Sequence, residues 1–358
     1  MHGCHPMKTP LRLTITWGAI LKVLVAAALV YLLIRLAPLL QLLFLALLLA
    51  IGLSPIMSWL NGKGAPRWLG LVLCSILLLG SALLFFGVLV PTIAREAGGL
   101  VGSLPRLRDQ FLGALPASGP VHDAANHLLG SSAFKDPAPL VKHVGGWATY
   151  ALDAIASFFV MLMIALYLLA DGPRVSAWLI AFLPPTDRAK TRAASAEITS
   201  VVSHYVLGQV ITSVLCGLYA FLVLALLHVP NPLGLAFLAA VLDVLPLVGF
   251  FLFTIPAVAV AATVSPTAAL IVAICYLAYK FAEDYLIVPL VYGNALRLST
   301  LTVLISCLAA GLVGGVIGII VILPIVASYP VIERFWLRPY LEPDTVQRHD
   351  EADRQASG

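Results

Sequence analysis

The chain has 358 residues, of which 61% are hydrophobic and only 11% are charged. An ordinary soluble domain has about 45–50% apolar and about 25% charged residues, so this composition excludes a soluble enzyme of ordinary surface, a disordered chain and a nucleic-acid binder. The net charge of +4 is small and requires no acidic partner. The composition therefore indicates an integral membrane protein, whose length is best counted in spans of about 20 apolar residues.

The N-terminal quarter of the chain predicts three spans. Residues 1–16 are polar and partly basic, and the apolar runs that follow cover 17–91. We place span 1 at 17–36 and span 2 at 38–60, with a break at Pro38, and span 3 at 67–91. A cleaved signal peptide has the same order of charges, but apolar sequence continues past Pro38, which favours an uncleaved first helix.

Two polar segments flank the fourth span. Residues 92–146 hold glycine, proline, serine and charges of both signs, and we expect short amphipathic helices there. Span 4 follows at 147–170, and the segment 171–202 is basic. The positive-inside rule places that basic segment in the cytoplasm, as it does the N-terminus, and puts 92–146 outside.

The remaining apolar sequence, residues 203–330, is harder to divide. Span 5 occupies 203–228, and the stretch 232–263 is interrupted by polar, proline and glycine residues. If that stretch crosses once, the chain has eight spans, whereas a re-entrant hairpin reverses the later orientation. We favour eight crossings in an all-α protein, followed by a flexible polar tail at 331–358.

Ionisable residues inside the apolar runs are the first candidates for function, because each costs about 2.5–3.5 kcal/mol at mid-bilayer. Lys280, Glu283 and Asp284 are spaced i, i+3 and i+4, which places them on one helix face. The face could bind a cation, a proton or a polar solute. Equally, it could be an ion-paired cluster that anchors the helix end at the interface.

Asp243 lies in a stretch that also contains Pro246 and Gly249, which disfavour a regular helix. Irregular backbone at membrane depth is tolerated where it is buried in protein or lines a wet cavity, and broken helices of this kind form transporter sites. The alternative is a simple kink or surface turn. We assign Pro256, Pro289 and Gly293 to the same irregular backbone.

The run from Gly311 to Gly318 holds two overlapping small-xxx-small pairs, 311/315 and 314/318. Small residues at this spacing let another helix approach closely. We therefore expect Gly311, Gly314, Gly315 and Gly318 to pack against a neighbouring helix, and they could also serve a moving contact.

The sequence contains none of the hydrolase, zinc-protease, P-loop or dinucleotide-binding motifs. The five cysteines form no CxxC pair, and three histidines within 92–146 lack metal spacing. An intramembrane aspartyl protease using Asp171 and Asp243 is opposed by the Gly-Pro pair that follows Asp171. We predict no enzymatic activity, no cofactor and no metal.

Several stretches in order resemble the autoinducer-2 exporter family of permeases. They are Phe44–Pro55, Ala165–Gly172 with Leu183-Pro184, Tyr205–Gln209, Leu245–Gly249 with Ile255–Ala257, Glu283–Leu298 through Pro289 and Gly293, and Gly315–Pro324. The resemblance covers about residues 17–330. It implies an oligomeric eight-span membrane protein that exports autoinducer-2 or, in some members, exchanges sodium for protons. The chain departs from the family pattern at Phe250-Phe251 and Ser299.

We therefore expect a multi-pass permease of a bacterial cytoplasmic membrane that exports a small polar solute, with autoinducer-2 as the candidate. Alternating access would occur around the Asp243–Gly249 break and the Glu283/Asp284 face, driven by a gradient because no ATP-binding motif is present. The expected partners are the bilayer, a solute or cation and further copies of the chain, without nucleic acid. A sodium/proton antiporter and a non-transporting membrane scaffold or regulator are the alternatives.

Overall fold

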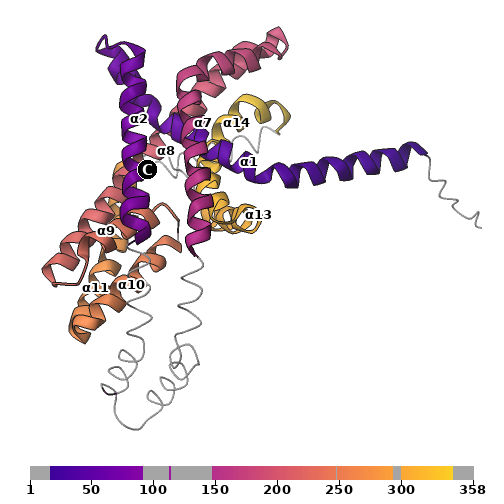
Figure 1. The fold of residues 1–358 in the computed structure, drawn as a ribbon. Coiled ribbons are helices and arrows are strands. Elements are labelled where there is room, and N and C mark those ends of the chain that lie inside the picture. The colour runs from indigo at the N-terminus through magenta and orange to yellow at the C-terminus, as the bar shows by residue number, and fades with distance from the viewer. Residues whose placement is uncertain (1–16, 92–112, 114–146, 247, 293–299, 342–358) are drawn as a thin grey trace, which may run out of the picture.

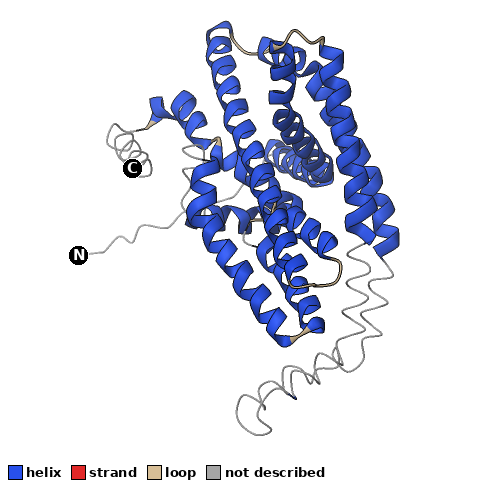
Figure 2. Cartoon of the chain, turned by 90° about the vertical axis from the view of Figure 1, so that its left-hand side faces the viewer, coloured by secondary structure: helices blue, strands red, loops and turns tan. Residues whose placement is uncertain are grey.

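The computed structural model describes residues 17–91, 113, 147–246, 248–292 and 300–341. Within these residues every regular element is helical, which confirms the predicted all-α class (Figure 2). Five helices of the described part are long and apolar enough to cross a membrane. The expected amphipathic helices of 92–146, the N-terminus 1–16 and the tail beyond 341 lie outside the described residues, apart from Gly113.

The helices follow one another along the chain with few long connections (Figure 1). Their bounds are α1 Trp17–Gly62, α2 Arg67–Leu84, η1 Phe85–Leu89, α7 Trp147–Ala181, α8 Pro185–Leu226, α9 Pro232–Leu242, α10 Val248–Val264, α11 Pro266–Ala282, η2 Glu283–Ile287, α12 Val288–Tyr292, α13 Thr300–Ala327, α14 Tyr329–Ile332, η4 Glu333–Leu337 and η5 Arg338–Tyr340.

Helix α1 corrects the predicted break between spans 1 and 2. It continues through Pro38 for 46 residues, about 69 Å at 1.5 Å per residue. Proline removes only one backbone donor, and apolar helices tolerate that loss where neighbouring groups or local adjustment compensate. The N-terminal half of α1 projects away from the other helices (Figure 1), and its side chains from Leu24 to Ile34 are exposed.

Helices α7 and α8 extend beyond the predicted spans, so the basic segment 171–202 is mostly helical. The chain turns between them at Leu183-Pro184, where two consecutive prolines, Pro184 and Pro185, disfavour a continuous helix. Arg188 stabilises this turn, because its guanidinium donates to the carbonyls of Ala181 at 2.9 Å and Leu183 at 3.0 Å. A cation at this position also satisfies the free carbonyls at the end of α7.

Helices α9 and α10 form a first helical hairpin, and residues 243–246 between them are irregular. They pack on each other and on α8 and α11 in the largest apolar cluster, which includes Leu224, Ala239, Phe253 and Tyr276. At 11 and 17 residues they measure about 16 and 25 Å, shorter than the roughly 30 Å hydrocarbon core. The broken stretch predicted from the sequence is therefore present.

Helix α13 contains a second hairpin, which lies within a continuous apolar run. Gly315 has φ +58° and ψ −145°, a conformation that only glycine adopts readily. The chain folds back there, so a Cβ on Gly318 would lie 2.2 Å from the carbonyl oxygen of Ala310. Cys307 and Leu323, on opposite arms, belong to one buried cluster.

This second hairpin changes the role expected for the glycine run. Gly311 approaches Ile319 and Gly318 approaches Ala310, so both face the other arm of the same segment. Gly314 faces the side chain of Gln41 on α1. The close approaches thus occur mainly within α13, because the left-handed backbone at Gly315 reverses the chain.

Three π-helical turns of the described part each end two residues before a proline. They are η1 before Pro91, η2 before Pro289 and η4 before Pro339. A proline ring clashes with the carbonyl four residues earlier and cannot donate to it, and a widened turn relieves that clash. In η2 this places a π turn, a feature frequent at functional sites, at Glu283 and Asp284.

The residues after α13 correct part of the predicted flexible tail at 331–358. Residues 331–340 are helical, and Val331 and Glu333 are buried. Arg334 forms an ion pair with Glu197 on α8. Apolar residues within this polar segment thus let its beginning pack against the helical body.

Candidate functional site

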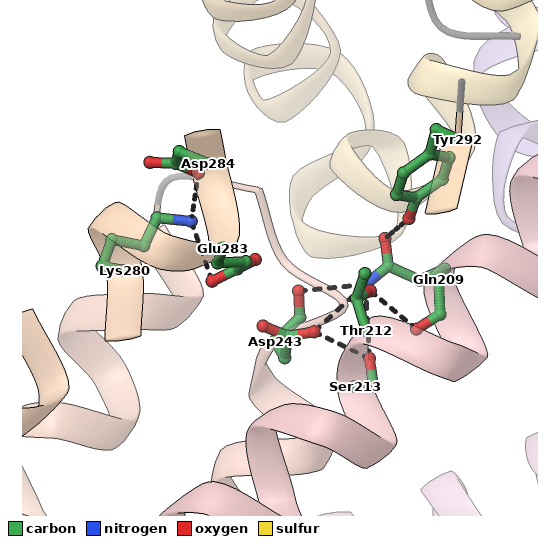
Figure 3. A network of polar contacts seen from close by, with 8 residues as sticks. All are labelled: Gln209, Thr212, Ser213, Asp243, Lys280, Glu283, Asp284 and Tyr292. Atoms are coloured by element: carbon green, nitrogen blue, oxygen red, sulfur yellow. Dashed lines mark hydrogen bonds and ion pairs between the residues drawn. The ribbon is translucent and has the colours of Figure 1, made fainter. Parts of the chain in front are cut away.

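A cavity of about 480 Å³ lies among α8, both helical hairpins and the helix formed by α11, η2 and α12. This volume falls within the range of small-molecule sites. Its lining includes all four of the predicted ionisable residues, and Figure 3 shows them with their neighbours. The lining residues are Tyr205, Gln209, Thr212, Asp243, Leu245, Pro246, Phe250, Phe253, Lys280, Glu283, Asp284, Tyr285, Val288, Tyr292, Val303 and Leu323.

Asp243 sits at the carboxyl end of α9, where the regular helix stops. Its carboxylate accepts a hydrogen bond from the Ser213 hydroxyl at 2.9 Å and a longer one from the Gln209 amide at 3.4 Å. The same amide also lies 3.3 Å from the Asp243 backbone carbonyl. Two side chains of α8 therefore hold the break of the first hairpin.

Gln209 connects this carboxylate to the opposite end of the cavity. Its amide oxygen accepts a hydrogen bond from the Tyr292 hydroxyl at 3.1 Å, and Figure 3 shows the amide between the two partners. The Tyr292 ring lies against Gly208, where a Cβ would be only 2.7 Å from the ring. The glycine thus makes room for the ring, and the ring brings its hydroxyl to Gln209.

Lys280, Glu283 and Asp284 form one ion-paired cluster, as their spacing predicted. The Lys280 ammonium lies 3.3 Å from the Glu283 carboxylate and 3.0 Å from that of Asp284. Glu283 is buried and the Asp284 side chain is half-exposed. With Asp243, three carboxylates face one ammonium in the lining, which gives the cavity a formal excess of negative charge.

The remaining predicted residues have different places. Pro246 lines the cavity, whereas Gly249 lies at the start of α10 and closely approaches the Leu242 carbonyl. Pro256 lies inside α10, and Pro289 lies in the short helix α12. Gly293 falls outside the described residues.

The uncharged polar side chains of the site were not predicted as site residues. Gln209, Thr212, Ser213 and Tyr292 extend the polar surface around Asp243. A glutamine inside the apolar run 203–228 was the available signal, because an amide in a membrane helix also needs partners.

The chemistry of the lining is that of a hydrogen-bonding and cation-attracting site. Carboxylates accept only, an amide both donates and accepts, and hydroxyls do either. No group of three or more acidic, histidine or cysteine side chains suited to a metal ion occurs within the described residues.

The fold and this cavity define a class: a multi-pass α-helical membrane protein with a polar site between helical hairpins, as in membrane transporters. The chain matches the AI-2E transporter family over residues 20–338 and belongs to that family. It therefore has a membrane transport role in a bilayer, and its relatives are described as transporters and not as enzymes.

Several bacterial relatives align with most of this chain. YrrI of Bacillus subtilis (strain 168), described as a candidate transport protein, is 24% identical over 82% of this chain and 87% of its own length. The AI-2 transport protein TqsA of Escherichia coli (strain K12) is 25% identical over 78% and 81%. MT0215 of Mycobacterium tuberculosis (strain CDC 1551 / Oshkosh), also described as a candidate transport protein, is 25% identical over 89% of both chains.

Proposed function

We propose that this protein is a gradient-driven secondary transporter that exports a small polar solute across a bacterial cytoplasmic membrane. Autoinducer-2 is the candidate solute, because the name of the relative TqsA refers to it. We also propose that the chain works as a homo-oligomer, without a nucleic-acid partner.

The proposal is carried by the position of Asp243. Its carboxylate lies at the break of one helical hairpin and lines the same cavity as Glu283, which is buried and begins the π turn η2. An ionisable group in an apolar helix is costly and is expected to serve transport or coupling. Short hairpins that enclose a polar cavity are suited to alternating access, because each can shift while the long helices stay in place.

The chemistry of the cavity supports a solute with hydroxyl or carbonyl groups, or a cation. Gln209, Thr212 and Tyr292 supply neutral hydrogen-bonding groups, while the excess of carboxylates disfavours an anion. Asp243 and Glu283 are the residues we propose for coupling to a proton or cation gradient. Transport without such coupling would need another energy source, and the sequence has no ATP-binding motif.

The test is solute flux in proteoliposomes with an imposed proton or sodium gradient. We expect Glu283→Gln to abolish gradient-driven flux while leaving membrane insertion intact. Asp171→Asn is the matched control, because Asp171 pairs with Arg174 at an exposed position away from the cavity. Wild-type flux in Glu283→Gln would remove Glu283 from the mechanism.

The same vesicles separate the alternatives. A sodium/proton antiporter, which the carboxylates and ammonium of the cavity would also suit, predicts sodium movement driven by a pH difference in the absence of solute. A scaffold or regulator predicts that combined Asp243→Asn and Glu283→Gln substitutions leave the cellular phenotype unchanged. Either result would replace the solute-export proposal.

A further inference from the structure

The hydrogen bonds of Gln209 join two parts of the molecule that are far apart in sequence. On one side its amide nitrogen lies near Asp243, 34 residues away, and on the other its amide oxygen meets Tyr292, 83 residues away. Asp243 belongs to the turn of the α9–α10 hairpin, and Tyr292 ends α12. One amide on α8 therefore lies between two elements that enclose the cavity.

The orientation of this amide depends on the charge of Asp243. An ionised carboxylate only accepts hydrogen bonds, so the amide must turn its N–H groups toward Asp243 and its oxygen toward Tyr292. The Tyr292 hydroxyl then has to donate, which is the arrangement found. A neutral Asp243 carries an O–H that seeks an acceptor, and the amide oxygen can meet it after half a turn, which exchanges the 3.3 Å contact between the amide nitrogen and the Asp243 backbone carbonyl for this new bond. The amide N–H would then face Tyr292.

Tyr292 has little freedom to absorb this change. Its ring fits against Gly208, and it is buried in a cluster with Tyr205 and with Cys307 and Leu323 from the two arms of α13. The ring of Tyr205 lies 5.9 Å from it, measured between centroids. A reversal of the hydrogen bond at the Tyr292 hydroxyl therefore alters the packing between α12 and the second hairpin.

We infer that Gln209 is a positioning residue that transmits the charge state of Asp243 to Tyr292 and, through Tyr292, to the α13 hairpin. This inference deepens the proposed function and rests on it, since it links the coupling carboxylate to a hairpin that the proposed alternating access would move. The other titratable groups that face Asp243 are Cys216 and Tyr205 on α8, Tyr279 and Lys280 on α11, Glu283 on η2 and Tyr292 on α12.

Cys307 provides a readout that needs no transported solute. It is buried at 5% exposure on the first arm of α13, beside Tyr292. In a full-length chain whose other four cysteines are replaced by alanine, the rate of Cys307 alkylation by N-ethylmaleimide reports the opening of that hairpin. All rates are compared at one pH, because the alkylation rate of a thiol also depends on pH.

Asp243→Asn imitates the neutral carboxyl, because it offers N–H donors and carries no charge. We expect it to change the alkylation rate of Cys307 at least about fivefold, the lower end of typical coupling between sites. In chains that also carry Gln209→Met or Tyr292→Phe, the same substitution should leave the rate within about twofold. Tyr292→Phe removes one oxygen and keeps the ring packing, so it tests transmission separately from folding.

Tyr219→Phe is the matched control, since it removes a comparable hydrogen bond, 2.9 Å to the Cys275 carbonyl, outside this connection. It should preserve the full effect of Asp243→Asn. The inference is overturned if Asp243→Asn leaves Cys307 unaffected, or if its effect persists in both the Gln209→Met and Tyr292→Phe chains. Absence of flux with an intact alkylation effect would count against the proposed function alone.

Discussion

Gly249 offers a direct test of how tightly the first hairpin is closed. A Cβ at this position would lie 2.0 Å from the carbonyl oxygen of Leu242 and 2.9 Å from its carbon. Real Cβ atoms do not come within 3.0 Å of such neighbours, so the two backbones must separate by about 1 Å. The obstacle is backbone, so no side-chain rotation can relieve it.

The cost of Gly249→Ala follows from that geometry. Overpacking of a well-filled interior costs about 1–3 kcal/mol, and a rigid neighbour puts this case near the upper end. Alanine regains at most about 1 kcal/mol of helix propensity, so a net loss of about 2 kcal/mol is expected. A shift beside Leu242 is also expected to disturb the 2.9 Å hydrogen bond between Ser213 and Asp243, the residue next to Leu242.

The assay combines thermal unfolding of the purified protein with flux in proteoliposomes. Gly80→Ala is the control, because it also lies in a helix but a Cβ there has no neighbour within 4 Å. We expect Gly80→Ala to keep or raise the unfolding midpoint, and Gly249→Ala to lower it and to reduce flux. Equal midpoints and equal flux in the two variants would refute a closed hairpin at Gly249.

Three further substitutions test other parts of the structure. Lys280→Met leaves the buried Glu283 carboxylate without its cation and should destabilise the protein by about 3–5 kcal/mol. Adding Glu283→Gln to this variant should recover most of the lost thermal stability. An unchanged unfolding midpoint in the single variant would contradict the pairing. Gly315→Ala forces a side chain into a left-handed backbone and should cost about 1–3 kcal/mol in thermal unfolding, and an unchanged midpoint would argue against the reversal there. Gly208→Ala should displace the Tyr292 ring and thereby lower the flux in proteoliposomes. Unaltered flux would show that the ring can move freely.

The charged part of the site was predictable because helical spacing and polarity act together. Lys280, Glu283 and Asp284 are close in sequence, so a helix alone brings them onto one face, and the structure has them in contact. Asp243 could be selected because proline and glycine follow it within an apolar stretch. Its position in the same cavity as the other three residues depends on tertiary packing, which a local sequence pattern does not reveal.

The second hairpin and the Gln209 contacts could not be predicted in the same way. Two adjacent glycines at 314–315 suit either a turn or a helix packing face, and only the left-handed φ of Gly315 distinguishes them. At Pro38 a break was predicted where none exists, since α1 continues through this proline. Gln209 carries no charge, and its importance comes from partners 34 and 83 residues away.

The two hairpins share a construction that bears on how the cavity could open. In each, a glycine on the second arm approaches a carbonyl near the end of the first arm, Gly249 to Leu242 and Gly318 to Ala310. Their linings differ, because the first contributes the carboxylate of Asp243 and the second contributes only the apolar Val303 and Leu323. An apolar wall forms no hydrogen bonds that must break when it moves. If the cavity opens as proposed, moving the two side chains of the α13 hairpin that line it breaks no hydrogen bond of the site, whereas moving the first hairpin breaks those between Asp243 and α8.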